Sequence, residues 1–100
     1  MQMEKDIGTI VQENGLTAIY AYTPMCGTCQ LAGKMVRVVE KVTTAFVWLH
    51  IDLNYYESFA VEQMIESVPC LLVFKDGQLV EKMYAFHSVP HLYEKLNKYI

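Results

Sequence analysis

Met25-Cys26-Gly27-Thr28-Cys29 holds two cysteines separated by two residues, directly after an apolar run and at the expected start of a helix. At this spacing the two sulfurs can bond to each other within one helical turn. A helix start also places the first sulfur where backbone N–H groups point outward and favour negative charge, so a thiolate there is a ready nucleophile. The same C-x-x-C spacing forms half of many zinc sites, so the motif alone leaves two chemistries open.

Length and composition fit a single domain over residues 1–100. Of the 100 residues, 53% are apolar and 19% are charged, which supplies enough apolar material for a core. The net charge of −3 leaves no basic surface of the kind that binds nucleic acid. No apolar run approaches the length of a membrane span. We therefore expect neither nucleic acid nor a membrane as a partner.

The first residues, Met1-Gln2-Met3-Glu4-Lys5-Asp6, are polar and include acids, so they do not resemble a signal peptide. We therefore expect a cytoplasmic location, where the medium is reducing. A lone C-x-x-C in that compartment is catalytic or metal-binding more often than structural. Cys70 makes the cysteine count odd, which argues further against a framework of disulfides.

Apolar periodicity and turn residues predict eight elements in the order helix, strand, helix, strand, helix, strand, strand, helix. They cover residues 3–13, 17–22, 26–43, 45–51, 54–65, 70–74, 79–86 and 88–99. Strands separated by helices indicate crossover connections and parallel pairing, and the Asp76-Gly77 turn adds an antiparallel strand. The sequence therefore predicts an α/β fold, a three-layer α/β/α sandwich with a mixed four-stranded sheet. The two cysteines follow the carboxyl end of the first strand, where open α/β sheets place their sites.

Finer assignments follow from the same patterns. The strand over 45–51 is predicted to be buried, and Met64 is assigned to the core. Asn54, with Glu57 three residues later, resembles a capping box that begins the third helix. Asp52 is assigned a cap or turn role. The second helix has a regular series of apolar positions: Leu31, Met35, Val38, Val39 and Val42.

Three segments together resemble the thioredoxin family. They are Tyr22-Thr23-Pro24-Met25-Cys26-Gly27-Thr28-Cys29, Ile51-Asp52-Leu53-Asn54 and Ser67-Val68-Pro69-Cys70-Leu71-Leu72-Val73-Phe74-Lys75-Asp76-Gly77. The likeness covers nearly the whole chain and implies a thioredoxin-like fold. The short strand that opens many thioredoxins is missing from it, because this chain starts on the first helix.

The resemblance assigns roles to individual residues. Cys26 corresponds to the exposed attacking thiol and Cys29 to the buried resolving thiol. Pro69 corresponds to the family's cis-proline beside the disulfide, and backbone groups of Val68 would then face the substrate. Among the flanking residues, Met25 could rim the substrate groove and Gly27 leaves room for the substrate to approach. The Thr28 hydroxyl could donate a hydrogen bond to a cysteine sulfur or be a small residue at the helix start.

The sequence also departs from the family. The buried aspartate of many thioredoxins, six residues before the first cysteine, is Tyr20 here, and its lysine partner falls at Trp48. The proton shuttle that helps to deprotonate the resolving thiol therefore has no obvious substitute. The helix-kinking proline is replaced by Lys34, and a family glycine late in the last strand by Ala85.

The function that these features imply is dithiol–disulfide exchange in an enzyme that reduces protein disulfides. The expected partners are a disulfide-containing protein or small thiol substrate and a cytosolic reductase or thiol as electron donor. No cofactor or bound metal is expected beyond the redox-active Cys26–Cys29 pair. A variant that uses Cys26 alone on glutathione mixed disulfides is disfavoured, because the Pro-Tyr pair common between glutaredoxin cysteines is absent.

One alternative is a binding module on the same fold, whose thiols hold a metal or an iron–sulfur cluster. Cys70 is then a candidate third ligand, and His50, His87 and His91 are candidates for the fourth, although none has ligand spacing from the cysteines. The reading of Cys70 as a small buried side chain in a strand is favoured, because free cysteine is among the most buried residue types.

Overall fold

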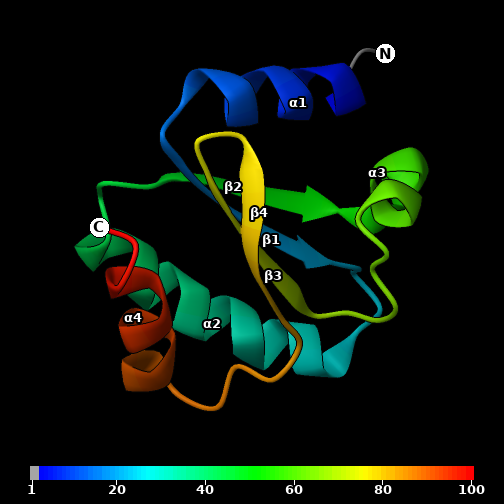
Figure 1. Ribbon diagram of the computed structural model, residues 1–100. Coiled ribbons are helices and arrows are strands. Elements are labelled where there is room, and N and C mark those ends of the chain that lie inside the picture. Colours follow the sequence, from blue (N-terminus) through cyan, green and yellow to red (C-terminus); the bar gives the residue numbers. More distant parts are fainter. Residues whose placement is uncertain (1–2) are drawn as a thin grey trace.

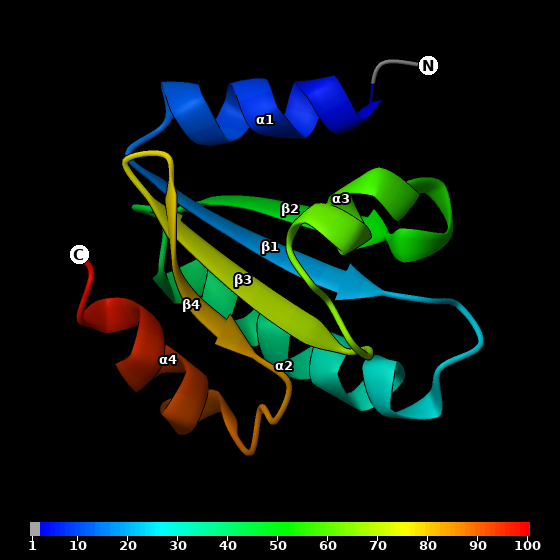
Figure 2. The ribbon, with the colours of Figure 1, turned by 45° about the vertical axis from the view of Figure 1, so that its right-hand side comes forward.

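The computed structural model describes residues 3–100, and side chains from residue 7 onward. The predicted order of helices and strands is confirmed: α1 (Met3–Glu13), β1 (Leu16–Tyr22), α2 (Gly27–Val42), β2 (Val47–Asp52), a short 3₁₀ turn η1 (Leu53–Tyr55), α3 (Glu57–Glu62), β3 (Cys70–Lys75), β4 (Gln78–Met83) and α4 (Val89–Asn97). Helices α1 and α3 lie on one face of the sheet, and α2 and α4 lie on the other (Figures 1 and 2). This is the predicted three-layer α/β/α sandwich.

The four strands lie in the order β2-β1-β3-β4. Only the β1–β2 pair is parallel within this sheet, whereas β3 runs antiparallel to both β1 and β4. The expectation that every helical connection gives a parallel pair is therefore wrong for α3. This helix has six residues. Six helical residues rise about 9 Å, whereas six strand residues span about 20 Å, so α3 cannot carry the chain back along a strand.

The central strands β1 and β3 divide the core into two groups of side chains, one on each face of the sheet. Tyr20 and Leu71 point toward α2 and α4, where they pack with Val36 and Leu92. The other group contains Ile7, Ile19, Ala21, Ile51, Phe59, Cys70, Leu72 and Phe74. Because both faces of β1 and β3 are covered, these two strands are nearly continuous apolar runs in the sequence.

The buried face of α2 does not follow the apolar series that indicated the helix. Leu31, Val38 and Val42 are exposed, and the residues that face the sheet are Cys29, Ala32, Gly33, Val36 and Val39. Small residues occupy the first half of this face because the aromatic ring of Tyr20 lies against it. A Cβ atom added to Gly33 would lie 3.5 Å from the Tyr20 hydroxyl.

Three finer predictions are also wrong. Ile51 is the only buried residue of β2, because β2 is an edge strand and pairs on one side alone. Met64 is 72% exposed and has a positive φ of 51°, so it lies in the turn after α3 and does not join the core. Asn54 lies inside η1 and caps nothing; the carboxylate of Asp52 accepts the hydrogen bond from its backbone N–H instead. The cap role of Asp52 is thus confirmed.

The predicted turn is confirmed, and the last helix begins with a serine cap. Asp76 and Gly77 both have positive φ, 51° and 85°, as the tight turn between β3 and β4 requires. Ser88 begins α4, and its hydroxyl accepts a hydrogen bond from the backbone N–H of His91 at 3.2 Å.

Candidate active site

The two cysteines lie at the start of α2, after the loop that follows β1. The N–H of Cys26 donates to the carbonyl oxygen of Thr23 at 3.2 Å, which turns the chain out of the strand. Cys26 is the N-cap of α2, and its sulfur accepts a hydrogen bond from the N–H of Cys29 at 3.1 Å. Backbone donors at a helix N-terminus stabilise negative charge, so this is a position where a thiolate is favoured.

Cys26 and Cys29 form a disulfide, and their Cα atoms are 5.2 Å apart. The two sulfur atoms differ in access to solvent. Cys26 is half-buried, whereas Cys29 is only 5% exposed. An incoming reactant therefore meets Cys26 before Cys29.

Two of the predicted neighbours contact the sulfur of Cys26. The Thr28 hydroxyl lies 3.3 Å from it, and since a disulfide sulfur carries no hydrogen, the hydroxyl is the donor. The carbonyl oxygen of Val68 lies 3.9 Å from the same sulfur. The Val68–Pro69 peptide bond is cis, which confirms that prediction. The structure thus brings together two segments that are forty-two residues apart in the chain.

A groove of about 340 Å³ lies next to the motif, between the first half of α2 and Pro69. Its wall includes the expected Thr28 and Pro69, and also Leu31, Met35 and Phe86, which the sequence did not single out for a site, and His87, which was considered there only as a metal ligand. The exposed Leu31 was the available signal, because an apolar side chain next to a reactive thiol indicates contact with a partner. Met25 is 96% exposed beside the motif, and no atom lies within 4 Å of the place that a Cβ of Gly27 would occupy.

A second cavity of about 400 Å³ lies on the other side of Cys29. Tyr20 and His50 form part of its wall, with Gly33, Lys34 and Arg37 of α2. The buried Tyr20 hydroxyl donates a hydrogen bond to the carbonyl oxygen of Cys29. Burial raises the pKa of Tyr20, and the nearby Arg37 guanidinium opposes this in part. Tyr20 therefore remains a neutral hydrogen-bond donor where many thioredoxins hold an aspartate.

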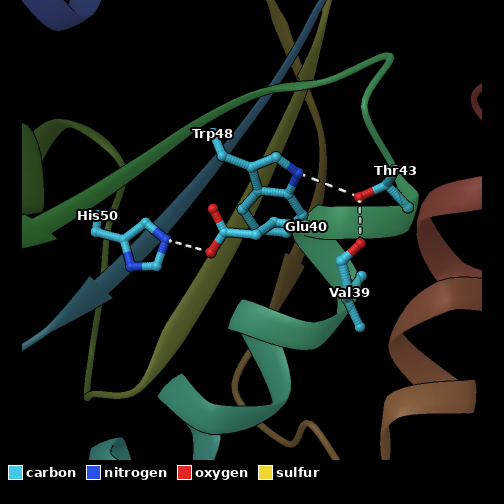
Figure 3. Close-up of polar contacts among 5 residues, drawn as sticks. All are labelled: Val39, Glu40, Thr43, Trp48 and His50. Carbon is cyan, nitrogen blue, oxygen red and sulfur yellow. Dashed lines mark hydrogen bonds and ion pairs between the residues drawn. The ribbon is translucent and has the colours of Figure 1, made fainter.

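Trp48 occupies the position of the family's lysine and has a structural role. Its indole N–H donates to the Thr43 hydroxyl at 3.2 Å, and that hydroxyl donates to the carbonyl oxygen of Val39 at 2.8 Å (Figure 3). These bonds join the end of α2 to β2. Nothing in this chain of contacts reaches the cysteines.

Cys70 lies on the opposite face of the sheet from the disulfide. Its side chain packs in the group that contains Ala21 and Phe59, and its exposed fraction is 0%. Burial raises the pKa of Cys70 to about 11, and the Lys82 ammonium and the Tyr84 hydroxyl oppose this in part. The surroundings of Cys70 therefore support a structural role for this buried side chain.

We expect the Cys70→Ser variant to keep the disulfide-exchange rate of the parent protein, because this thiol does not reach the disulfide. The raised pKa of Cys70 favours its neutral form when folded. The stabilisation that comes from keeping this thiol neutral in the folded state is therefore complete below about pH 9, and it is lost as the pH rises toward about 11. Over this pH range the free energy of unfolding, measured with urea, should fall more in the parent protein than in the variant, by on the order of 2 kcal/mol. A large fall in exchange rate would contradict the structural role.

The described residues do not form a metal site of the kind considered above. No group of three or more His, Cys, Asp or Glu side chains among them is arranged to hold an ion. His87 and His91 contact each other edge to face, with ring centroids 4.7 Å apart, and His50 pairs with Glu40. The three histidines thus lie in two separate places.

Comparisons with known proteins agree with the fold and the motif. The sequence model of the thioredoxin family matches residues 3–98. Thioredoxin-like protein YusE of Bacillus subtilis (strain 168) is 48% identical over 86 residues, which are 86% of this chain and 81% of that protein. A thioredoxin of Staphylococcus aureus (strain N315) is 29% identical over 92 residues, 88% of this chain and 86% of its own length.

Solved structures give the same fold. The thioredoxin of Plasmodium falciparum superposes with a TM-score of 0.88 at 21% identity, covering 97% of this chain and 94% of that chain. The thioredoxin of Fasciola hepatica gives 0.86 at 19% identity, covering 96% and 93%. With its C-x-x-C disulfide at the start of α2, the molecule is a thiol–disulfide oxidoreductase. The chain belongs to the thioredoxin family.

Proposed function

We propose that the protein reduces disulfide bonds of protein substrates, with Cys26 as the attacking thiol and Cys29 as the resolving thiol. The observation that carries this proposal is the difference between the two sulfurs. Cys26 is the more exposed one, and both a backbone N–H and the Thr28 hydroxyl point at it. Hydrogen bonds of this kind stabilise a thiolate, whereas Cys29 is nearly buried and borders the second cavity.

The proposed reaction has two steps. The Cys26 thiolate attacks one sulfur of a substrate disulfide, forms a mixed disulfide and releases the other sulfur as a thiolate. Cys29, after losing its proton, attacks the Cys26 sulfur. The Cys26–Cys29 bond forms and the bond to the substrate breaks, so the substrate gains two electrons and leaves as a dithiol. An external thiol or reductase then reduces the protein's own disulfide.

The surroundings of Cys26 support an extended polypeptide as the substrate. The Val68 carbonyl group, next to the sulfur, is available to accept a hydrogen bond from a substrate backbone in the manner of an added strand. Thr28 and Pro69 line the adjacent groove, and Met25 is a long, exposed apolar side chain next to the motif. Gly27 leaves the approach to the sulfur open.

We place the protein in the cytoplasm, with a cytosolic thiol or reductase as electron donor. No helix within residues 3–100 has both the length and the apolar character needed to cross a membrane. The metal-binding alternative is not favoured, because Cys70 lies on the far face of the sheet from the other two cysteines.

The test is an equilibrium redox titration of the metal-free protein, read by thiol alkylation and intact mass. We expect one two-electron transition that protects Cys26 and Cys29, at a potential below about −220 mV, as for a disulfide reductase. A transition near −120 mV, the range of strong oxidants, would indicate disulfide formation in substrates instead. The absence of reversible pairing would contradict dithiol exchange altogether.

A further inference from the structure

The second cavity connects solvent with the buried side of Cys29. Its volume of about 400 Å³ admits several water molecules, and both Cys29 and His50 contribute to its wall. Tyr20 and His50 are register partners in the parallel β1–β2 pair, so both side chains point to the α2 face of the sheet. Their rings contact edge to face, with centroids 5.6 Å apart. Cys29, Tyr20 and His50 therefore line one cavity, and Tyr20 contacts both of the others.

His50 is the side chain in this wall that has a ring nitrogen able to accept a proton. The Tyr20 phenol already donates to Cys29, and its raised pKa keeps it protonated. Lys34 and Arg37 are cations, which donate hydrogen bonds but have no lone pair to accept a proton. No carboxylate belongs to the described wall.

Glu40 prepares His50 for this role. Its carboxylate oxygen lies 2.9 Å from Nε2 of His50 (Figure 3). A carboxylate only accepts hydrogen bonds, so Nε2 carries the hydrogen and Nδ1 is left with a free lone pair. Nδ1 has no partner among the described residues. The same carboxylate stabilises the imidazolium that forms when Nδ1 is protonated.

We propose that His50, held by Glu40, accepts the proton of Cys29 through solvent in the second cavity when Cys29 resolves the mixed disulfide. This rests on the dithiol exchange proposed above. The Cys29 S–H bond breaks, its proton passes to Nδ1 of His50, and the sulfur lone pair forms the bond to Cys26 while the substrate thiolate leaves. His50 is a positioning residue for the proton and does not touch the reacting sulfurs. The His50–Glu40 pair thus supplies in this chain what the aspartate supplies in many thioredoxins.

Charged groups of both signs surround His50. The Glu40 carboxylate contacts its ring, and Lys34 and Arg37 of α2 line the same cavity. From β1, Tyr20 has a pKa raised by burial and Tyr22 stacks on its ring, and Asp52 is the other ionisable group of β2. We expect removal of the imidazole to change the pH dependence of the resolving step.

The experiment is a stopped-flow reaction of the reduced Cys70→Ser protein with 5,5′-dithiobis(2-nitrobenzoate). Attack by Cys26 releases one thionitrobenzoate in a first phase, and resolution by Cys29 releases the second. In His50→Gln we expect an unchanged first phase and a second phase about tenfold slower at pH 7. We expect no larger fall in the second-phase rate, because a free thiol is already a few per cent thiolate at this pH and this fraction reacts without help. The two rates should converge above about pH 9, where thiols ionise unaided.

Two further variants separate a proton-transfer role from a structural one. Glu40→Gln removes the carboxylate and should give an intermediate second-phase rate. His91→Gln removes an imidazole of α4 that is not in the wall of this cavity, and it should match the parent protein. A second phase of His50→Gln with the parent's rate and pH profile, or an equal loss in His91→Gln, would overturn the proposal. If the parent itself showed no first phase, the proposed function would fail instead.

Discussion

Cys26→Ser is expected to abolish disulfide exchange. The hydroxyl of serine is far less acidic than a thiol, and the N–H of Cys29 and the hydroxyl of Thr28 cannot make it an adequate nucleophile toward a disulfide. We expect the rate of insulin reduction in the presence of dithiothreitol to fall, after subtraction of the uncatalysed rate, by at least about 10⁴-fold. Turbidity of the precipitating insulin chains measures this rate directly.

The matched control for this variant is Cys70→Ser, which makes the same chemical change at the thiol that lies on the other face of the sheet. A normal rate in this control, with a lost rate in Cys26→Ser, assigns the activity to the helix N-terminus. Retention of insulin reduction by Cys26→Ser would rule out the proposed nucleophile.

Cys29→Ser is expected to trap the mixed disulfide between Cys26 and a substrate. The first step needs only the Cys26 sulfur, but the second needs the Cys29 thiol, which the variant lacks. The adduct should therefore persist for minutes to hours, roughly the range of uncatalysed disulfide rearrangement. Intact mass spectrometry under non-reducing conditions, with peptide mapping to Cys26, detects it.

Cys26→Ser/Cys29→Ser is the control for trapping, because it keeps Cys70 and should yield no adduct. If Cys29→Ser released substrate as fast as the parent protein, Cys29 would not be the resolving thiol. If the double variant formed the adduct as well, Cys70 would be the reacting residue, contrary to its burial.

Sequence patterns predicted the order of elements well because each depends on neighbouring residues alone. The errors arose where burial depends on distant parts of the chain. Periodicity along α2 indicated a helix through apolar residues such as Leu31 and Val42. The side of this helix that is buried is set instead by the Tyr20 ring of β1, which leaves room for the small residues Gly33 and Ala32. Similarly, the apolar residues of β2 did not reveal that it lies at the edge of the sheet.

The site was predictable only in its reactive part. The C-x-x-C motif and the Val68-Pro69 pair are local signals, and the structure places them at one sulfur. The surroundings of Cys29 were not predictable in this way. Tyr20 and His50 become neighbours through strand register, and His50 meets Glu40 through the packing of α2 on the sheet. The loss of the aspartate was therefore visible in the sequence, whereas the place of His50 beside that position was not.

The position of β1 between β2 and β3 also has a consequence for protein synthesis. Residues 16–42, including both cysteines, leave the ribosome well before β3 at residues 70–75. At roughly 5–20 residues per second, a few seconds pass in which one edge of β1 has no partner and the segment with Val68 and Pro69 has not yet covered Cys26. The nascent chain thus carries its thiols before it has the groove that selects their substrates. During that interval, protection of these cysteines from unwanted pairing has to come from the surrounding medium.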